Sequence, residues 1–237
     1  MIQSALSAWK ASSPATAFLI AYGFQLTLFL AWGGYIAAGN WLLRVKVRTG
    51  AILDARPLHP SQLRHEIVRG IASCAVVALV TTACIQRADS VVPSSAWRLG
   101  LEMASLILFY DVVFYLFHRL LHTRALRAIH GVHHHSVRPT PWSGLSVHPV
   151  EAFLLEAPIL MFVFVMPVSV ATLALFQILI QYFSAVGHSN FDPFARLPGW
   201  GWLKSLMRMH QLHHARGNVN FSTFSPLLDW IFKTHAV

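Results

Sequence analysis

Eight histidines from residue 118 onward are grouped at short, regular spacings, and two single histidines join them as candidates. His118 and His122 form an H-x-x-x-H motif, and two H-x-x-H-H motifs follow at residues 130–134 and 210–214. The candidate metal ligands are His118, His122, His130, His133, His134, His148, His188, His210, His213 and His214. Imidazole binds zinc, copper, iron and nickel. One H-x-x-x-H motif is common in proteins, but the repeated grouping predicts a metal centre.

The two H-x-x-H-H triplets favour two metal ions over one. Residues three and four apart share a face of a helix, so His130 shares a face with both His133 and His134. The two neighbours themselves diverge by about 100° at 3.6 residues per turn. One helical turn can therefore direct imidazoles toward two adjacent ions.

An acidic residue within an apolar stretch is a further candidate. Asp111 lies where an ionisable side chain is expensive and normally functional, in one helical stripe with His118 and His122. Ligating histidines commonly donate their second N–H to a carboxylate. We therefore predict that Asp111 orients a metal ligand without binding the metal; a polar contact between helices is the alternative. Glu151 and Glu156 are weaker candidates for the same role.

The elements that must position these residues are apolar helices. Hydrophobic residues make up 55% of the 237-residue chain and charged residues only 11%, against about 25% charged in soluble domains. Four apolar stretches cover roughly residues 15–43, 67–86, 99–117 and 153–183. A spanning helix needs about 20 residues, so each of the first three predicts one retained span. We predict an all-α integral membrane bundle, as a single domain over residues 1–237.

The fourth stretch is too long for one span. Residues 153–183 would extend about 46 Å at 1.5 Å per residue, beyond a hydrocarbon core of about 30 Å. Pro158 and Pro167 also interrupt it, and proline disfavours a continuous helix. We predict two shorter helices in a hairpin that enters and leaves on the same side. A single tilted, kinked helix is the alternative.

The formal net charge of +9 is unevenly distributed. Arginine and lysine are frequent over residues 44–69 and 119–138, whereas the link between the second and third stretches holds only Arg87 and Arg98. The positive-inside rule places residues 44–69 and everything from residue 118 onward in the cytoplasm. We thus expect a His-rich cytosolic helical cap on a membrane stem, with a bacterial inner membrane as the location. We expect the excess of basic residues to contact anionic lipid headgroups. No soluble basic face that could bind nucleic acid is visible.

The order of the motifs resembles that of a known family. HRLLH, HGVHH, VHPVE, GHSN and HQLHH, followed by Asn218 and SPLLDWIFKT, resemble the fatty acid hydroxylase and sterol desaturase superfamily. The resemblance covers roughly residues 100–235, the expected catalytic region. It implies an integral membrane enzyme with a cytosolic di-iron centre that oxidises a lipid with O2 and two electrons. The implied ligands are the histidines named above, with His148 as an addition to the core set.

One position departs from the resemblance, and the resemblance also implies a partner. Fatty acid 2-hydroxylases often carry a histidine four residues before the position of His188, where this chain has Ser184; His148 is the candidate to fill that gap. The sequence has no HPGG haem motif and no Gly-rich dinucleotide fingerprint. We expect electrons from a separate ferredoxin, cytochrome or reductase. Two iron ions are the expected cofactors, with zinc able to replace them in purified protein.

The predicted function is a membrane-bound non-haem di-iron oxygenase that hydroxylates or desaturates a C–H bond of a lipid. A zinc-dependent membrane hydrolase is one alternative, but it needs a general base as in H-E-x-x-H, and Glu151 is the only nearby substitute. A metal transporter is the other, but it needs polar ligands within the spans, where only Asp111 lies deep. Further candidates to line a lipid tunnel or orient ligands are Trp142, Phe221, Phe224, Asn190, Asn218 and Asn220.

Overall fold

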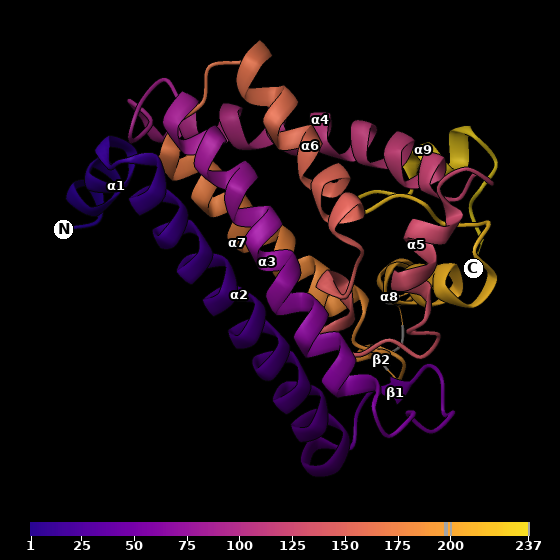
Figure 1. The fold of residues 1–237 in the computed structure, drawn as a ribbon. Coiled ribbons are helices and arrows are strands. Elements are labelled where there is room, and N and C mark those ends of the chain that lie inside the picture. The colour runs from indigo at the N-terminus through magenta and orange to yellow at the C-terminus, as the bar shows by residue number, and fades with distance from the viewer. Residues whose placement is uncertain (197–198, 200, 237) are drawn as a thin grey trace.

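The computed structural model describes residues 1–196, 199 and 201–236 and is built almost entirely of helices. Its stem contains α2 (Pro14–Leu42, continued by a π-helical turn, Leu43–Val47), α3 (Gln62–Arg87), α4 (Ala96–Leu121), α6 (Pro149–Val165) and α7 (Val170–Gly187) (Figure 1). Helices α2, α3, α4 and α7 are long and apolar enough to cross a membrane. The predicted all-α membrane bundle is confirmed.

Shorter elements gather at the two ends of the stem. Helix α1 (Ile2–Ala11) lies at one end, whereas α5 (Arg127–His134), the 3-10 turn η2 (Ser143–Leu145), α8 (Gly201–Arg216) and α9 (Leu227–Ile231) lie at the other (Figure 1). Strands β1 (Ala51–Ile52) and β2 (Phe191–Asp192) pair antiparallel at this second end. The second end carries the histidine motifs and is called the cap.

The fourth apolar stretch folds as a helical hairpin. Helix α6 ends before Pro167 and α7 begins after it, whereas Pro158 is accommodated inside α6. The turn lies beside the loop that follows α3, where Ser90 and Ser169 form an isolated bridge. The chain returns to the cap, since His188 follows α7 directly. The turn of the hairpin therefore reaches the level of the α3–α4 loop. The prediction of a hairpin is confirmed, and the alternative of a single kinked helix is wrong.

Helix packing separates a buried core from a lipid-facing surface. Helix α2 packs against α3 and α7, and α6 contacts both α3 and α4. In the core, the rings of Tyr110 and Phe176 lie 5.1 Å apart, centroid to centroid. On the opposite side of α4, Leu108, Val112 and Leu116 are exposed. Such a row of exposed apolar side chains suits contact with lipid tails.

A buried carboxylate, Glu66 of α3, anchors the loop that precedes η2. It is 1% exposed and accepts hydrogen bonds from the hydroxyls of Ser136 at 2.7 Å and Ser143 at 2.8 Å. The hydroxyl of Thr140 and the side-chain amide of Gln62 donate to it as well. Four hydrogen-bond donors thus surround one carboxylate, and no basic side chain among the described residues pairs with it.

Removing this carboxylate is expected to destabilise the fold. Glu66→Ala leaves several buried hydroxyls unpartnered and should lower the free energy of unfolding by about 3 kcal/mol. Glu66→Gln, which keeps the side-chain size and one acceptor oxygen, should lose less. Thermal unfolding in detergent measures both, with the exposed Thr27→Ala as control. Equal stability of Glu66→Ala and Thr27→Ala would contradict the anchoring role.

Candidate metal centre

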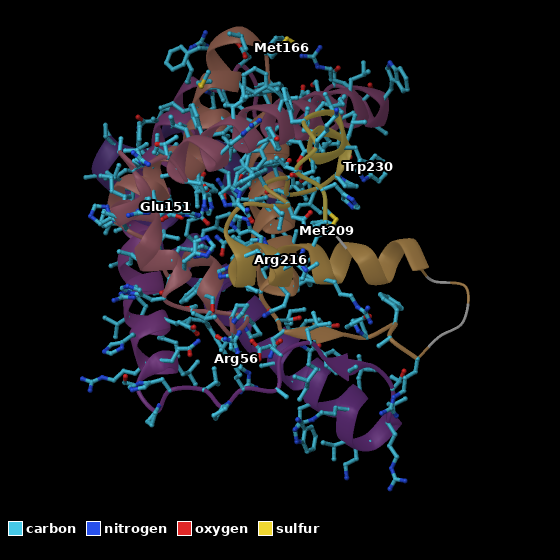
Figure 2. All side chains as sticks on the ribbon, turned by 90° about the vertical axis from the view of Figure 1, so that its right-hand side faces the viewer. Arg56, Glu151, Met166, Met209, Arg216 and Trp230 are labelled. Atoms are coloured by element: carbon cyan, nitrogen blue, oxygen red, sulfur yellow. The ribbon has the colours of Figure 1, made fainter. Side chains whose placement is uncertain are left out.

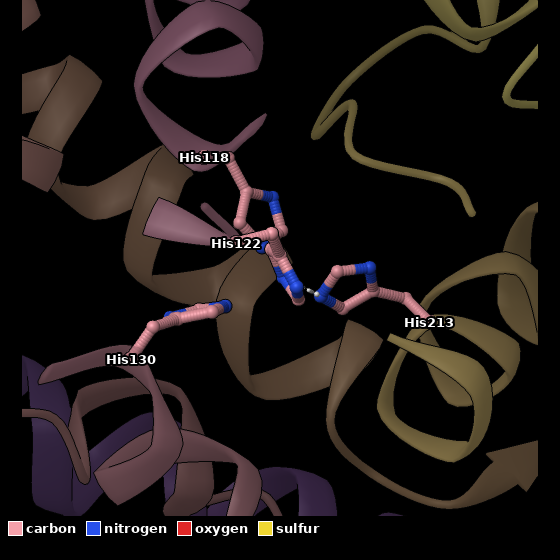
Figure 3. Close-up of side chains that lie close together, drawn as sticks. All are labelled: His118, His122, His130 and His213. Atoms are coloured by element: carbon pink, nitrogen blue, oxygen red, sulfur yellow. Dashed lines mark hydrogen bonds between the residues drawn. The ribbon is translucent and has the colours of Figure 1, made fainter. Parts of the chain in front are cut away.

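Nine histidines converge within the cap, and eight of them form two clusters of possible ligands. Cluster A contains His118, His122, His130 and His213, and cluster B contains His133, His188, His210 and His214. Within each cluster the ligand nitrogens all lie within 4.8 Å of one another. The rings of cluster A point toward one another from α4, α5 and α8 (Figure 3). Each cluster therefore depends on segments that are distant in sequence.

Each H-x-x-H-H triplet contributes to both clusters. On α5, His130 belongs to cluster A and His133 to cluster B; on α8, the neighbours His213 and His214 also divide between the two. On α8 the divergence of adjacent side chains around the helix causes this division, whereas on α5 the two residues that divide lie three apart on one face. His134 lies between the clusters: its Nε2 is 3.0 Å from that of His130 in cluster A, and its ring centroid is 4.8 Å from that of His214 in cluster B.

The separations between ring nitrogens suit ligands of a common ion. In cluster B, Nε2 of His188 lies 2.7 Å from Nε2 of His210 and 3.2 Å from that of His133. In cluster A, the Nε2 atoms of His122 and His213 are 3.2 Å apart. Two nitrogens at right angles around one ion, each ~2.1 Å from it, lie about 3 Å apart. The observed distances match this arrangement.

Hydrogen bonds to backbone carbonyls fix three rings with Nε2 toward the clusters. Nδ1 of His118 donates to the carbonyl oxygen of Phe221 at 2.8 Å. Nδ1 of His188 donates to that of Ser184 at 2.7 Å, and Nδ1 of His213 donates to that of Val219 at 2.8 Å. A carbonyl oxygen only accepts, so Nδ1 carries the proton and Nε2 presents a lone pair. Facing lone pairs repel unless a cation lies between them. The donor set therefore fits bound metal ions.

A buried carboxylate supports a fourth ring. Glu151, in the first turn of α6, is 1% exposed and accepts a hydrogen bond from Nδ1 of His130 at 2.6 Å. This is the carboxylate–histidine contact that commonly raises the basicity of a ligand. Burial also keeps neighbouring rings neutral: desolvation lowers the pKa of His122 and of His134 to about 4 each. Neutral imidazole is the form that binds metal.

A cavity of about 200 Å³ opens onto the clusters. Its lining includes five histidines of the two clusters: His118, His130, His133, His188 and His210. The apolar lining comes from α4, α6, α7 and the loop after α8, and includes Phe114, Leu155, Ile180, Phe183 and Phe224. This catalytic cavity has the composition expected for a hydrocarbon chain that is presented to polar groups at one end.

Comparison with known proteins now assigns the family. Residues 103–234 match the model of a family described as fatty acid hydroxylase. The chain belongs to the fatty acid hydroxylase family. The matched segment contains all the histidines of clusters A and B, together with Glu151.

Several named proteins are similar in sequence to this member of the fatty acid hydroxylase family. Protein CER1-like 2 of Arabidopsis thaliana is 31% identical over 134 residues, which are 52% of this chain and 22% of the relative. Very-long-chain aldehyde decarbonylase GL1-5 of Oryza sativa subsp. indica is 30% identical over 137 residues, with the same two shares. Delta(7)-sterol 5(6)-desaturase ERG3A of Gibberella zeae is 25% identical over 253 residues, 98% of this chain and 67% of the relative. This chain thus spans about a fifth of the length of the first two, and no solved structure matches it.

The structure of this fatty acid hydroxylase family member places Asp111 away from the histidines. Its carboxylate accepts hydrogen bonds from the backbone N–H groups of Phe224 at 3.0 Å and Thr223 at 3.4 Å. The contact predicted for Asp111 is made by Glu151 instead. Asp111 holds the loop after α8, and the carbonyl of Phe221 in that loop orients His118, so its effect on the ligands is indirect.

The remaining predicted residues also lie outside the two clusters. His148 caps the N-terminus of α6, where its Nδ1 accepts a hydrogen bond from Val150 N–H at 3.1 Å, and it belongs to neither cluster among the described residues. Asn190 bonds the backbone of Asp54, and Asn220 donates to the carbonyl of Met209. Asn218 is exposed, and Glu156 accepts from Gln177. Of the tunnel candidates, Phe224 lines the catalytic cavity, Phe221 packs against the ring of His122, and Trp142 lines a second cavity.

Sequence reasoning missed the role of Gly144, which lets η2 approach cluster B. A Cβ atom at this position would lie 3.2 Å from Nδ1 of His188 and 2.0 Å from the hydroxyl oxygen of Ser184. Rotation of Ser184 cannot relieve the contact fully, because its own Cβ is also 3.2 Å away. No pattern in the sequence marks this requirement.

We expect Gly144→Ala to disturb cluster B. The shift of η2 or of His188 should destabilise the protein by about 1 kcal/mol and lower its metal content. Gly23→Ala is the matched control, because a Cβ there meets nothing within 4 Å. Thermal unfolding in detergent and metal analysis of both variants measure the effect. Identical behaviour of the two variants would contradict it.

Proposed function

We propose that this protein is a membrane-bound non-haem di-iron oxygenase that hydroxylates or desaturates a C–H bond of a lipid, with O2 and external electrons. The observation that carries the proposal is the pair of four-histidine clusters that border an apolar cavity. Membership of the fatty acid hydroxylase family supports lipid oxidation. The names of its relatives, a sterol desaturase and aldehyde decarbonylases, support substrates of this class.

We propose that clusters A and B each hold one iron, with His134 between the clusters, and that zinc can replace iron in purified protein. When bound, the two irons would supply the activation of O2 and the oxidation of an unreactive C–H bond. The chain itself contributes orientation and exclusion of water. Hydrogen bonds at Nδ1 hold the rings in place, Glu151 offsets positive charge beside His130, and the apolar lining binds the hydrocarbon chain.

The proposed electron donor is a separate ferredoxin, cytochrome or reductase. His122 is half-buried at the edge of cluster A. Four arginines that are near it in sequence or lie on α8 are exposed: Arg119, Arg124, Arg127 and Arg216. An acidic donor would be attracted to such a surface. The positive-inside rule places this cap in the cytoplasm, and we propose a bacterial inner membrane as the location, with residues 100–235 as the catalytic region.

Isotope labelling tests the proposed reaction. Lipids are extracted from cells that express the wild-type chain or His133→Ala under 18O2 and are compared by high-resolution mass spectrometry. A hydroxylated lipid that carries 18O indicates hydroxylation, and a new double bond without label indicates desaturation; either must be absent from His133→Ala. A product formed equally without O2 would contradict the oxygenase and favour the hydrolase.

A further inference from the structure

A second cavity, of about 250 Å³, lies in the cap at the end of α2. It shares no lining residue with the catalytic cavity. Its walls come from the end of α2, the loop before α3, the first turn of α3, the loop before η2, and residues 189–191. The proposed oxygenase chemistry makes no use of this cavity.

Among the described residues, two arginines and no carboxylate line the second cavity. Arg44 is exposed and has no hydrogen bond or ion pair within the described part of the chain. Arg138 donates from Nη1 to the carbonyl of Arg56 at 2.6 Å, while its buried Nε has no partner. The nearby carboxylate of Asp54 is bound by Arg56 and does not line the cavity. Two guanidinium groups with unused donors favour an anion, and phosphate suits their geometry.

The rest of the lining is apolar and aromatic. Trp41 is 53% exposed, and Trp142, Leu58 and Leu63 complete much of the wall. A free inorganic anion would gain nothing from these side chains, whereas an amphiphile would cover them. The composition therefore favours a ligand that combines an anionic group with hydrocarbon.

The position of the cavity corresponds to the lipid headgroups. Arg44 and Trp41 lie at the cap end of the candidate span Pro14–Val47. Figure 2 shows Arg56 in the lower half of the molecule, far from Met166 of the α6–α7 turn at the top. Tryptophan is enriched at the membrane interface, and basic pockets between spans on the cytoplasmic side bind anionic headgroups.

We propose that the second cavity binds the phosphate group of an anionic phospholipid. Arg44 and Arg138 hold the phosphate, and the tryptophans and leucines cover the glycerol and the first methylenes. Because Ser189 follows His188 of cluster B and lines this cavity, the lipid braces the segment that leaves the metal centre. The proposal does not depend on which reaction the centre performs.

Native mass spectrometry of the detergent-purified protein tests the proposal. The protein is titrated with phosphatidylglycerol or phosphatidylcholine, and the bound lipid is counted. Phosphatidylglycerol should bind preferentially, and Arg44→Gln should weaken its binding about fivefold, as expected for one basic residue near a membrane surface. Arg44→Lys should retain most of the affinity. The exposed Arg87→Gln, at the far end of α3, should retain all of it.

Thermal unfolding separates the lipid from a free anion. Phosphatidylglycerol should raise the Tm of the wild type more than that of Arg44→Gln, and inorganic phosphate at the same concentration should leave both unchanged. Arg44 makes no hydrogen bond or ion pair within the described residues, so the variant is expected to fold. Equal retention of the two lipids, unchanged binding by Arg44→Gln, or equal stabilisation by inorganic phosphate would each overturn the proposal.

Discussion

His213→Ala is expected to remove about one of two metal ions per chain, because only three imidazoles of cluster A then remain to hold an ion. His133→Ala should empty cluster B in the same way. The measurement is metal content by plasma mass spectrometry, on protein purified from iron-supplemented cells. The reaction products described above should disappear in both variants.

His148→Ala is the control for both substitutions. His148 belongs to the same set of sequence candidates but caps α6 outside the clusters. This variant should retain both metal ions and lose only about 1 kcal/mol of stability, the usual effect of a lost helix cap. Metal loss in His148→Ala equal to that in His213→Ala would contradict the assignment of the clusters.

Glu151→Gln is expected to weaken metal binding by about tenfold, and Glu151→Ala by about 100-fold. Glutamine can still accept the hydrogen bond from His130, but it lacks the charge that offsets the ion. Alanine loses both. Retention of metal against increasing concentrations of a chelator measures the difference. Glu156→Gln is the matched control, since Glu156 lies on the same helix and bonds Gln177 rather than a histidine.

The apoprotein distinguishes a metal-related effect from a structural one. Glu151 is buried, and no lysine or arginine among the described residues pairs with it, so Glu151→Gln should leave the Tm of the metal-free protein unchanged or raise it. A metal-free variant that unfolds more easily than the wild type would assign Glu151 a purely structural role. Unchanged chelator resistance would contradict its support of His130.

The spans and the ligand motifs could be predicted from sequence because each is a local property. Hydropathy over about 20 residues decides whether a segment prefers lipid, and Pro167 marks the point where the long fourth stretch turns back. The H-x-x-H-H spacing fixes the divergence of neighbouring imidazoles on any helix. Those features needed no knowledge of how the helices pack.

The supporting residues could be predicted only in part, because they depend on tertiary contacts: the sequence marks Glu151 as a weaker candidate than Asp111 for orienting a ligand. Asp111 lies about 10 Å along the helix from His118, at 1.5 Å per residue, too far for a hydrogen bond to its ring. Glu151 reaches His130 only because α6 packs beside α5. The roles of Glu66 and Gly144 likewise arise from loops that meet only in the folded chain.

The division of both clusters between α5 and α8 has a consequence for biosynthesis. His213 follows His134 by 79 residues, and at 5–20 residues per second the ribosome needs roughly 4–16 s to add them. During that interval the earlier imidazoles are already synthesised while their partners do not yet exist. Complete coordination is therefore a late event. It follows insertion of the α6–α7 hairpin and requires the synthesis of α8, the last long helix.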